Sequence, residues 1–525
     1  MKALLKIAVV FLLWSCAQQA PLTGGDKDTV PPKIIEFKTN PKNLSTNFQS
    51  NTVKVEFNEY IKLKNTSKNF FVNPPIQNID VKAANKTVLI SINEKLKNQT
   101  TYTFNFGNAI EDITEGNVLE DFKYVISTGA FIDSNFFNGF AYDAFSKKPI
   151  EKTKVLLFEN EIDTLNDEAL PNYFSMAKED GSFALENLKD SPFFLVAFED
   201  ENENNSYDSK TERIGFINSQ IVPLNKQDSS SKAPSLALFS EEKKLKLIDK
   251  KYLFPGKILL LFNQKTDAVN VSSMEKKLFQ MVRNQPSDSV EFWIDSITTK
   301  LQTFKISSPL LDSTRSISIP TLAPKVVESI FTFKVKNLSN LKPNRPLQLQ
   351  FNHPILSVDS QKINLSKDSI FYPLNFEYTD NIFFLYLPEN KSESFKLSAL
   401  PGAFNSIYGF TNDSTTIKIQ PKSKSDYGSI YFSVSVSDAS NFICQVLKNE
   451  KIVESFYSTN HSLKGSSTMC LPGNYNLRII KDTDKNRKFT TGNFIKKKQP
   501  EQVIYYNEPI EIKAGWDVEV NWEIK

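Results

Sequence analysis

The chain has 525 residues, enough for roughly three to five domains of ordinary size. Its 63 basic and 60 acidic residues leave a formal net charge of +3, so no strong positive field points to a nucleic-acid partner. Apolar residues make up 40% of the chain, with 42 Phe and 17 Tyr against 16 Gly, which supplies packed cores and excludes a disordered protein.

The first 15 residues have the pattern of a secretory signal peptide. Lys2 and Lys6 precede or flank the start of a short apolar run, residues 7–14, and the small residue Ser15 follows it. A helix that spans a bilayer needs about 20 apolar residues, so this run is too short to be a transmembrane helix. We therefore expect secretion.

Cys16 directly follows this signal. Together with Leu13, Trp14 and Ser15 it resembles a bacterial lipobox, although Trp14 departs from the small or aliphatic residue usual there. The resemblance implies that Cys16 is the lipidation site and the mature N-terminus, because several acyl chains together give stable membrane anchoring. Residues 16–30 then form a flexible tether, and the protein is expected at the outer membrane through its acyl anchor.

The sequence does not decide which leaflet of the outer membrane would hold the anchor. Asp26, the first acidic residue after Cys16, comes late for a surface-export signal, but the segment TGGDKD at 23–28 leaves the cell surface open, and we slightly favour it. The surface and the periplasmic leaflet both remain as alternatives.

Beyond the tether, apolar and polar residues alternate with period two. Such runs, rich in β-branched and aromatic residues, recur at roughly ten-residue spacing between turn residues, which is typical of antiparallel β-sandwiches. Examples are residues 52–57, 86–92, 101–106, 430–436 and 517–524. The predicted fold class is all-β, with tandem sandwiches.

Internal repeats divide the chain. At a shift of 294 residues, VKVEFNEYI at 53–61 corresponds to LQLQFNHPI at 347–355, and Ala109 and Ile113 correspond to Ala403 and Ile407. A weaker echo is KILLLFNQ at 257–264. At a shift of 282, a second set of residues matches: Leu195, Asp200, Asn202, Asn204 and Tyr207 with Leu477, Asp482, Asp484, Asn486 and Phe489.

Two family resemblances follow from these motifs. PPKIIEFKTNPKNLSTNF, VKVEFNEYIKL, TTYTFNFGNAIEDITEGN and FKYVISTG, within residues 31–129, resemble the bacterial Ig-like domain common in Bacteroidota lipoproteins. FNGFAYDAFSKKPIEKTKVLLFE at 137–159 and DGSFALENLKDSPFFLVAFEDENENNSYD at 180–208 are similar to the transthyretin-like, or carboxypeptidase-regulatory, sandwich. These resemblances imply fold and location rather than a reaction.

We therefore expect five modules after the tether. They are module 1 (31–129, Ig-like), module 2 (130–240, transthyretin-like), module 3 (245–335, a β domain with Ig-like features), module 4 (336–422, Ig-like) and module 5 (425–525, transthyretin-like).

Two acidic loops are the best candidate sites. Alternating oxygen ligands at positions 1, 3 and 5 of a loop can converge on Ca²⁺ as in an EF-hand, and such residues occur at the same place in modules 2 and 5. They are Asp200, Asn202, Asn204 and Asp208 in the first loop, and Asp482, Asp484 and Asn486 in the second. Neither loop has the usual glycine at position 6 or a glutamate at position 12, although Glu212 lies one residue beyond. The alternative is a polar turn that hydrogen-bonds its own backbone.

Cys444 and Cys470 are the remaining thiols. An oxidising compartment favours a disulfide between them, while the apolar context of Cys444 in FICQV favours a free buried cysteine. The histidines offer no catalytic pattern; His353 in FNHPI is expected at a surface or an edge. No nucleophile, zinc or phosphate-loop motif is found in the sequence.

The sequence thus favours a non-enzymatic outer-membrane lipoprotein that serves as a scaffold or interaction subunit of an envelope complex. Barrel-assembly or secretion machinery is the first partner to consider, and no nucleic acid is expected. The alternative is a surface module that binds glycans or peptides, for which the aromatic segments 136–142 and 370–378 would have to form one exposed platform. No cofactor beyond calcium is indicated.

Overall fold

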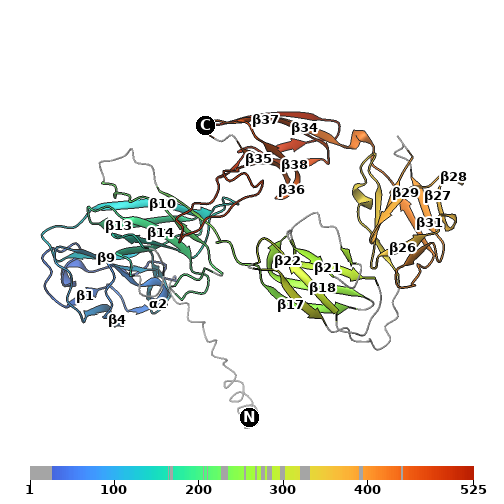
Figure 1. The fold of residues 1–525 in the computed structure, drawn as a ribbon. Helices are drawn as coiled ribbons and strands as arrows, with labels where there is room; N and C mark the ends of the chain where they lie inside the picture. The colour runs from blue at the N-terminus through green and yellow to red at the C-terminus, as the bar shows by residue number, and fades with distance from the viewer. Residues whose placement is uncertain are drawn as a thin grey trace, which may run out of the picture. The chain divides into compact units, whose positions relative to one another are not determined.

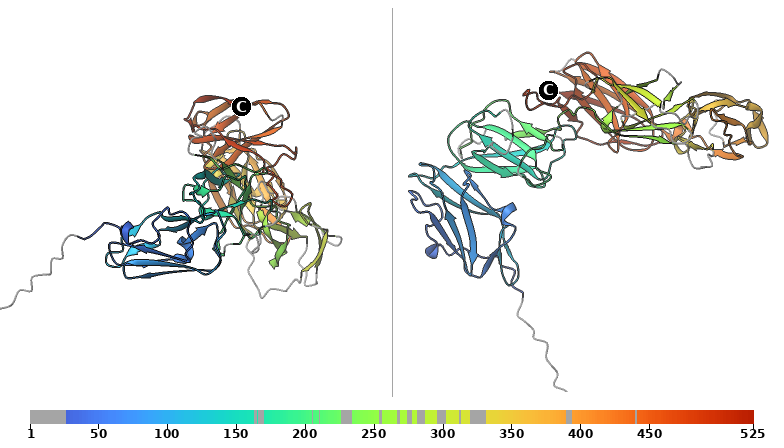
Figure 2. Two further views of the ribbon diagram at one scale, coloured as in Figure 1. Left: turned by 90° about the vertical axis from the view of Figure 1, so that its left-hand side faces the viewer. Right: turned by 60° about the horizontal axis from the view of Figure 1, so that its bottom comes forward.

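The computed structural model describes residues 27–525 with gaps, so Cys16 and the predicted signal peptide lie outside the described residues. The gaps are 163–164, 166–169, 205, 210, 226–233, 254–255, 267–268, 274–277, 281–286, 296–301, 312, 320–330, 389–393 and 439–440. Strands dominate the described chain, as Figure 1 and Figure 2 show, and the all-β class is confirmed. The short helical turns are η1 (Glu36–Lys38), α2 (Thr66–Asn69), η2 (Leu338–Asn340), η3 (Ser360–Lys362) and η4 (Lys424–Asp426).

Within this described part, no helix has the length and apolar character needed to cross a bilayer. The chain divides into two compact units. Unit 1 comprises Met1–Asp143, Lys147–Phe239 and Phe494–Lys497, and unit 2 comprises Ala144–Ser146, Ser240–Asn493 and Lys498–Lys525.

Buried apolar side chains form five main cores along the described residues. Each core is built by alternate residues of its strands, because successive side chains of a strand point to opposite faces of the sheet. Representative members, all almost fully buried, are Phe104, Leu195, Phe292, Phe351 and Leu477. The sequence periodicity therefore identified the strands that bury one face.

Module 1 consists of small antiparallel sheets with strand orders β1-β5-β4, β3-β6-β9 and β2-β7-β8. The strands are β1 (Thr52–Glu56), β2 (Ile61–Leu63), β3 (Phe71–Asn73), β4 (Ile79–Ala84), β5 (Thr87–Ile92), β6 (Thr101–Gly107), β7 (Ile110–Asp112), β8 (Val118–Leu119) and β9 (Phe122–Ser127).

Module 4 has the same arrangement, with orders β24-β25-β30-β29, β28-β27-β31-β33 and β26-β32. Its strands are β24 (Phe333–Val335), β25 (Leu347–Phe351), β26 (Ile355–Val358), β27 (Ile363–Lys367), β28 (Ile370–Tyr372), β29 (Asn375–Thr379), β30 (Ile382–Tyr386), β31 (Phe395–Ala399), β32 (Phe404–Ser406) and β33 (Thr415–Ile419). Because β24 pairs with β25 and Phe331 belongs to this core, module 4 begins before residue 336, where we had expected its boundary.

The 294-residue repeat extends to individual hydrogen bonds. The side-chain oxygen of Asn58 accepts the N–H of Lys33 at 2.6 Å, and that of Asn352 accepts the N–H of Thr332 at 3.0 Å. Similarly, the Ile113 N–H donates to the Tyr60 carbonyl at 3.0 Å and the Ile407 N–H to the Pro354 carbonyl at 3.2 Å. The recurring Phe-Asn motif thus fixes the segment that precedes each sandwich.

Module 3 follows a related plan, with orders β17-β18-β21-β20 and β19-β22-β23. Its strands are β17 (Leu247–Leu253), β18 (Lys257–Thr266), β19 (Asn270–Ser272), β20 (Leu278–Gln280), β21 (Ser287–Ile294), β22 (Gln302–Ser307) and β23 (Arg315–Ile319).

Modules 2 and 5 share a second plan. Module 2 has orders β13-β10-β16 and β12-β11-β14-β15, and module 5 has β37-β34-β41 and β36-β35-β38-β39, with β40 also on β38. The last strand of each module pairs in parallel with the first, β16 with β10 and β41 with β34.

The strands of module 2 are β10 (Asn135–Asp143), β11 (Thr153–Phe158), β12 (Tyr173–Met176), β13 (Ser182–Leu188), β14 (Phe194–Glu199), β15 (Ile214–Phe216) and β16 (Ser235–Leu238). Those of module 5 are β34 (Gly428–Val436), β35 (Phe442–Lys448), β36 (Lys451–Ser458), β37 (Ser462–Cys470), β38 (Gly473–Lys481), β39 (Val503–Tyr505), β40 (Ile510–Ile512) and β41 (Asp517–Ile524).

Candidate functional site

The two acidic loops begin at equivalent places in modules 2 and 5. Asp200 directly follows β14, and its N–H donates to the Lys152 carbonyl at 3.0 Å. Asp482 directly follows β38, and its N–H donates to the Asn441 carbonyl at 3.0 Å. Both aspartates are almost fully buried. The 282-residue repeat therefore places the two carboxylates at the same corner of the same sheet.

The loops also have the same internal hydrogen bonds. Asp200 Oδ1 and Asn202 Oδ1 both accept the Asn204 N–H, each at 3.0 Å. In the second loop, Asp482 Oδ1 and Asp484 Oδ1 accept the Asn486 N–H at 3.0 and 3.2 Å.

The third acceptor repeats as well. Asn204 Oδ1 accepts the Ser206 N–H at 2.8 Å, and Asn486 Oδ1 accepts the Lys488 N–H at 2.7 Å. Six of the seven oxygen-bearing side chains predicted as calcium ligands thus hydrogen-bond the backbone of their own turn, as in the alternative interpretation of a polar turn.

A buried glutamate closes each loop. Glu212 Oε2 accepts the N–H of Asp208 at 2.8 Å, and Glu501 Oε2 accepts the N–H of Thr490 at 2.9 Å. Asp208 and Thr490 are themselves related by the 282-residue shift. The two glutamates are not, because the second loop is longer before its glutamate, and for that reason the sequence repeat did not reveal Glu501.

The loops differ in what neutralises their carboxylates. Lys154 Nζ lies 2.7 Å from Asp200 Oδ2, and the two side chains are only 11% and 3% exposed. Lys154 pairs across the sheet with Phe198, and the equivalent residue, which pairs with Ile480, is the apolar Ile443. The second loop has no lysine at this position.

Carboxylates instead converge in the second loop. One oxygen atom from each of Asp482, Asp484 and Glu501 lies within 4.8 Å of the other two. Oxygen ligands of this kind suit hard cations such as Ca²⁺. The same groups accept protein hydrogen bonds: Glu501 Oε1 from the Thr483 N–H at 2.6 Å, and Asp484 Oδ2 from the Thr490 hydroxyl at 2.7 Å.

One carboxyl group in each loop has a shifted pKa: that of Glu212 is raised, and that of Asp484 is lowered. Burial raises the pKa of Glu212, and the Asp200 carboxylate adds to that rise. Glu212 Oε1 has no hydrogen-bond partner within the described part of the chain. In the second loop, the hydroxyl of Thr490 lowers the pKa of Asp484 by donating to its carboxylate.

Both cysteines of module 5 are buried free thiols in the structure. Burial raises the pKa of the Cys444 thiol to about 12, which keeps it protonated and unreactive. Cys470 Sγ contacts the Ser467 carbonyl oxygen at 3.4 Å.

The expectation that His353 lies at a surface is wrong. Its side chain is buried against Phe331, with ring centroids 5.9 Å apart, and against Tyr408 at 5.7 Å. Burial lowers the pKa of His353 to about 4, so the imidazole is neutral at physiological pH. The other histidine, His461, lies 3.1 Å through Nδ1 from the Val436 carbonyl oxygen.

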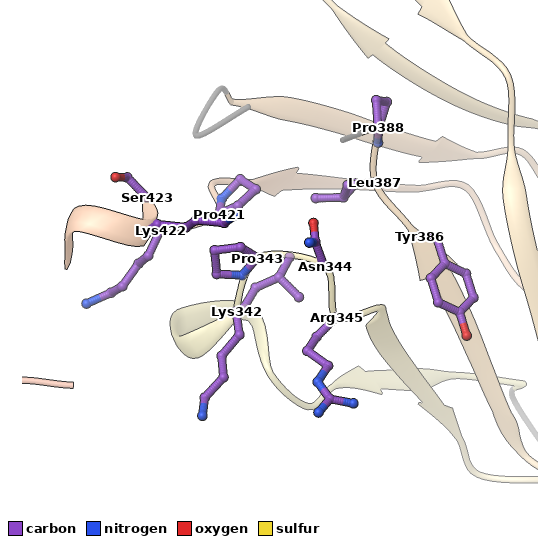
Figure 3. Close-up of a pocket in the computed structure, with 12 residues that line it drawn as sticks. Lys342, Pro343, Asn344, Arg345, Tyr386, Leu387, Pro388, Pro421, Lys422 and Ser423 are labelled. Atoms are coloured by element: carbon purple, nitrogen blue, oxygen red, sulfur yellow. The ribbon is translucent and has the colours of Figure 1, made fainter. Parts of the chain in front are cut away.

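A small pocket of about 260 Å³ is lined by the segment before β25, the end of β30 and the segment that follows β33. Figure 3 shows Pro343, Pro421 and Leu387 close together, while the charged ends of Lys342, Arg345 and Lys422 extend away from this wall. Cationic groups that diverge in this way do not define a single anion site. The pocket offers an apolar wall with a basic rim.

Comparison with known proteins identifies one segment by family. Residues 28–128 match the bacterial Ig-like domain, so module 1 is a domain of this type. No curated protein matches the chain.

Solved structures with similarity include surface and fibre proteins. The S-layer protein SbsC is 12% identical, covering 75% of this chain and 67% of its own, with a TM-score of 0.16. The major pilin subunit BcpA of Bacillus cereus is 11% identical, covering 74% and 99%, with a TM-score of 0.14. The BSP domain of a biofilm-associated protein is 8% identical, covering 88% and 95%, with a TM-score of 0.13.

Proposed function

We propose that this chain is a non-enzymatic, lipid-anchored scaffold of the outer membrane that holds protein partners of an envelope complex. The anchor is Cys16, and barrel-assembly or secretion machinery is the first partner class to test. The proposal is supported by the N-terminal signal pattern and, above all, by how the modules are joined within each unit.

The contacts between modules 1 and 2 carry the proposal. Asn73 is buried, and its side-chain amide donates from Nδ2 to the Phe174 carbonyl at 2.7 Å while its Oδ1 accepts the Phe174 N–H at 2.9 Å. The Phe71 and Phe174 rings also pack at 4.5 Å between centroids. A reciprocal pair of hydrogen bonds constrains both distance and orientation at this contact, which supports a specific junction between the two sandwiches.

Modules 3 and 4 are joined through specific contacts as well. The Tyr408 hydroxyl of module 4 donates to the Ile294 carbonyl of module 3 at 2.6 Å. A Cβ on Gly256 would lie 2.3 Å from that hydroxyl oxygen, so only glycine permits this approach. A chain that fixes neighbouring sandwiches in this way can present binding surfaces at set distances, as a scaffold requires.

The experiment that tests the proposal is affinity purification of a C-terminally tagged full chain from native membranes in mild detergent, with mass spectrometry of co-purifying proteins. We expect an outer-membrane barrel or assembly factor in stoichiometric yield. A matched chain with Cys16→Ala should lose both the membrane fraction and the partner. Recovery of the full-length chain alone would overturn the proposal.

The alternative glycan or peptide platform has less support. The exposed aromatic side chains of segment 370–378 lie on different sheets: Phe371 on β28 is 70% exposed, and Tyr378 on β29 is 40% exposed. In segment 136–142, Phe137 is buried and Phe140 exposed. These rings do not form one shared platform among the described residues.

A further inference from the structure

The sheet β28-β27-β31-β33 belongs to module 4 (Figure 1). Its outward face is mostly polar, and the strand register arranges its residues in rows. One cross-strand row runs from Phe371 through Ser366 and Lys396 to Lys418. A parallel row contains Asn364, Ser398 and Thr416, and the hydroxyls of the last two lie 3.4 Å apart. These residues line a shallow hollow of about 860 Å³.

Two lysines on this face have no counter-charge among the residues that the structure describes. Lys396 and Lys418 are direct cross-strand partners, and both are exposed. Like charges opposite each other destabilise a sheet. Among the described residues, neither ammonium group forms an ion pair, and the acid that lines the hollow, Asp368, is on the β27–β28 turn. The face therefore keeps a local positive charge at a cost in stability.

Exposed apolar surface borders the same charge. The Phe371 ring is 70% exposed at the edge of the row. A large exposed aromatic side chain beside polar groups is typical of the anchor residues of protein interfaces.

The equivalent face in module 1 is already a protein interface. The sheet β3-β6-β9 of module 1 corresponds to β27-β31-β33, and its outward residues contact module 2. Besides the Asn73–Phe174 pair, the Asn187 amide donates to Thr103 Oγ1 at 2.9 Å, and Lys123 Nζ lies 2.5 Å from Glu186 Oε2.

This interface is polar in the same way as the exposed face of module 4. It uses asparagine, threonine and lysine from the sheet, and its partner, module 2, is a β-sandwich that supplies a carboxylate. The face of module 4 offers asparagine, serine, threonine and two lysines, and none of the described residues covers it.

We propose that the outward face of β28-β27-β31-β33 docks an acidic β-sandwich surface of another protein, with Lys396 and Lys418 paired to its carboxylates and Phe371 packed at the rim. This inference rests on the proposed scaffold function and names the surface and the partner chemistry that serve it.

Site-specific photo-crosslinking in native cells tests the docking surface. The probes are full chains with Ser398→p-benzoylphenylalanine or Thr416→p-benzoylphenylalanine, and the control probe is Gln350→p-benzoylphenylalanine on the other sheet of module 4. We expect a discrete crosslinked protein from the first two probes and none from the control. Mass spectrometry should place the crosslink on a carboxylate-bearing strand of a β-sandwich.

Charge reversal then decides whether the lysines cause the docking. Lys396→Glu with Lys418→Glu should lower the crosslink yield at least about tenfold, because two negative charges would then face the carboxylates of the partner and repel them. Lys334→Glu with Lys336→Glu, an equal charge change on β24 and the residue after it, should leave the yield within about twofold. Reversal of the crosslinked carboxylates on the partner to lysine should restore the yield.

Folding is controlled by a milder variant. Lys396→Gln with Lys418→Gln removes the cross-strand repulsion, so we expect an equal or higher melting temperature together with loss of the crosslink. A lower melting temperature would assign the lysines to stability and overturn the proposal.

Other results also overturn it. These are no crosslink from either face probe, a crosslink that ignores Lys396 and Lys418, a crosslink to a second copy of this chain, or binding of the purified chain to polygalacturonate through the same lysines. The last would assign the face to an acidic glycan. Co-purification of a stoichiometric complex without a crosslink from this face would leave the scaffold function in place and refute only the surface.

Discussion

The two acidic loops have the same backbone hydrogen bonds but solve the problem of a buried carboxylate in different ways. In the first loop the ammonium group of Lys154 neutralises Asp200 at 2.7 Å. In the second loop Ile443 takes the place of that lysine, and the carboxylates of Asp482, Asp484 and Glu501 converge around backbone and hydroxyl donors. The two loops therefore share backbone hydrogen bonds but not an electrostatic environment. The ammonium group beside Asp200 comes from β11, and the equivalent residue in module 5, Ile443, is apolar.

The largest effect is expected from removing the lysine. Lys154→Met leaves the Asp200 carboxylate buried without its partner, which should destabilise module 2 by about 3 kcal/mol or more. Hydrogen–deuterium exchange of peptides covering residues 194–216 measures the change. Lys152→Met is the matched control, since its solvent-exposed pair with Glu203 should change the protection far less. Equal effects of the two variants would contradict the contrast between the loops.

The closing glutamates should respond differently to loss of charge. Glu501→Gln weakens charge-assisted hydrogen bonds from Thr483 and Thr490 and should cost roughly 1.5 to 3 kcal/mol. Glu212→Gln should cost less, because the native carboxylate is penalised by burial and by Asp200. Exchange protection in residues 200–212 and 482–501 compares them, and a larger loss in Glu212→Gln would reverse our ranking.

The loops should also respond oppositely to pH. The pKa of Glu212 is raised above its ordinary value of 4.5, so the folded state binds more protons and the first loop loses stability as pH rises through and above that value. The pKa of Asp484 is lowered from 3.8, so the second loop keeps its stability at neutral pH and loses it as pH falls below that value. Protection factors, corrected for intrinsic exchange and measured from pH 7 to pH 3, test both signs. A parallel response would refute the contrast.

The smallest effect is expected from calcium at the first loop. Millimolar CaCl₂ should leave exchange in residues 200–212 unchanged, because the Lys154 ammonium group already lies beside Asp200. The same titration on residues 482–501 tests the calcium prediction made from the sequence for the second loop. Protection of the first loop by calcium would show that Lys154 does not exclude the ion.

Sequence periodicity was sufficient for the architecture. Alternation placed residues such as Phe104 and Leu477 in cores, because alternate side chains of a strand point to the same face of the sheet. The Phe-Asn repeat and the 282-residue shift also corresponded to shared hydrogen bonds, such as those of Asn58 with Asn352 and Asp200 with Asp482. Polar residues that follow a strand at the same position in each repeat can therefore be identified from the sequence.

The sequence did not reveal side chains that come together only because strands far apart in the sequence pair. Lys154 reaches Asp200 because β11 pairs with β14, and Glu501 enters the second loop only after a longer connection. The sequence predicted a surface or edge position for His353, which is polar. In the fold, Phe331 and Tyr408 pack against its ring.

The sequence by itself determined the all-β class, the repeats and the strands that face a core. Only the tertiary structure decided which charged groups meet: Lys154 lies beside Asp200, and Lys396 and Lys418 lie in one cross-strand row with Phe371. The reason is physical. A strand pattern specifies which side of a sheet is buried, whereas strand register and module packing determine what each side chain meets there.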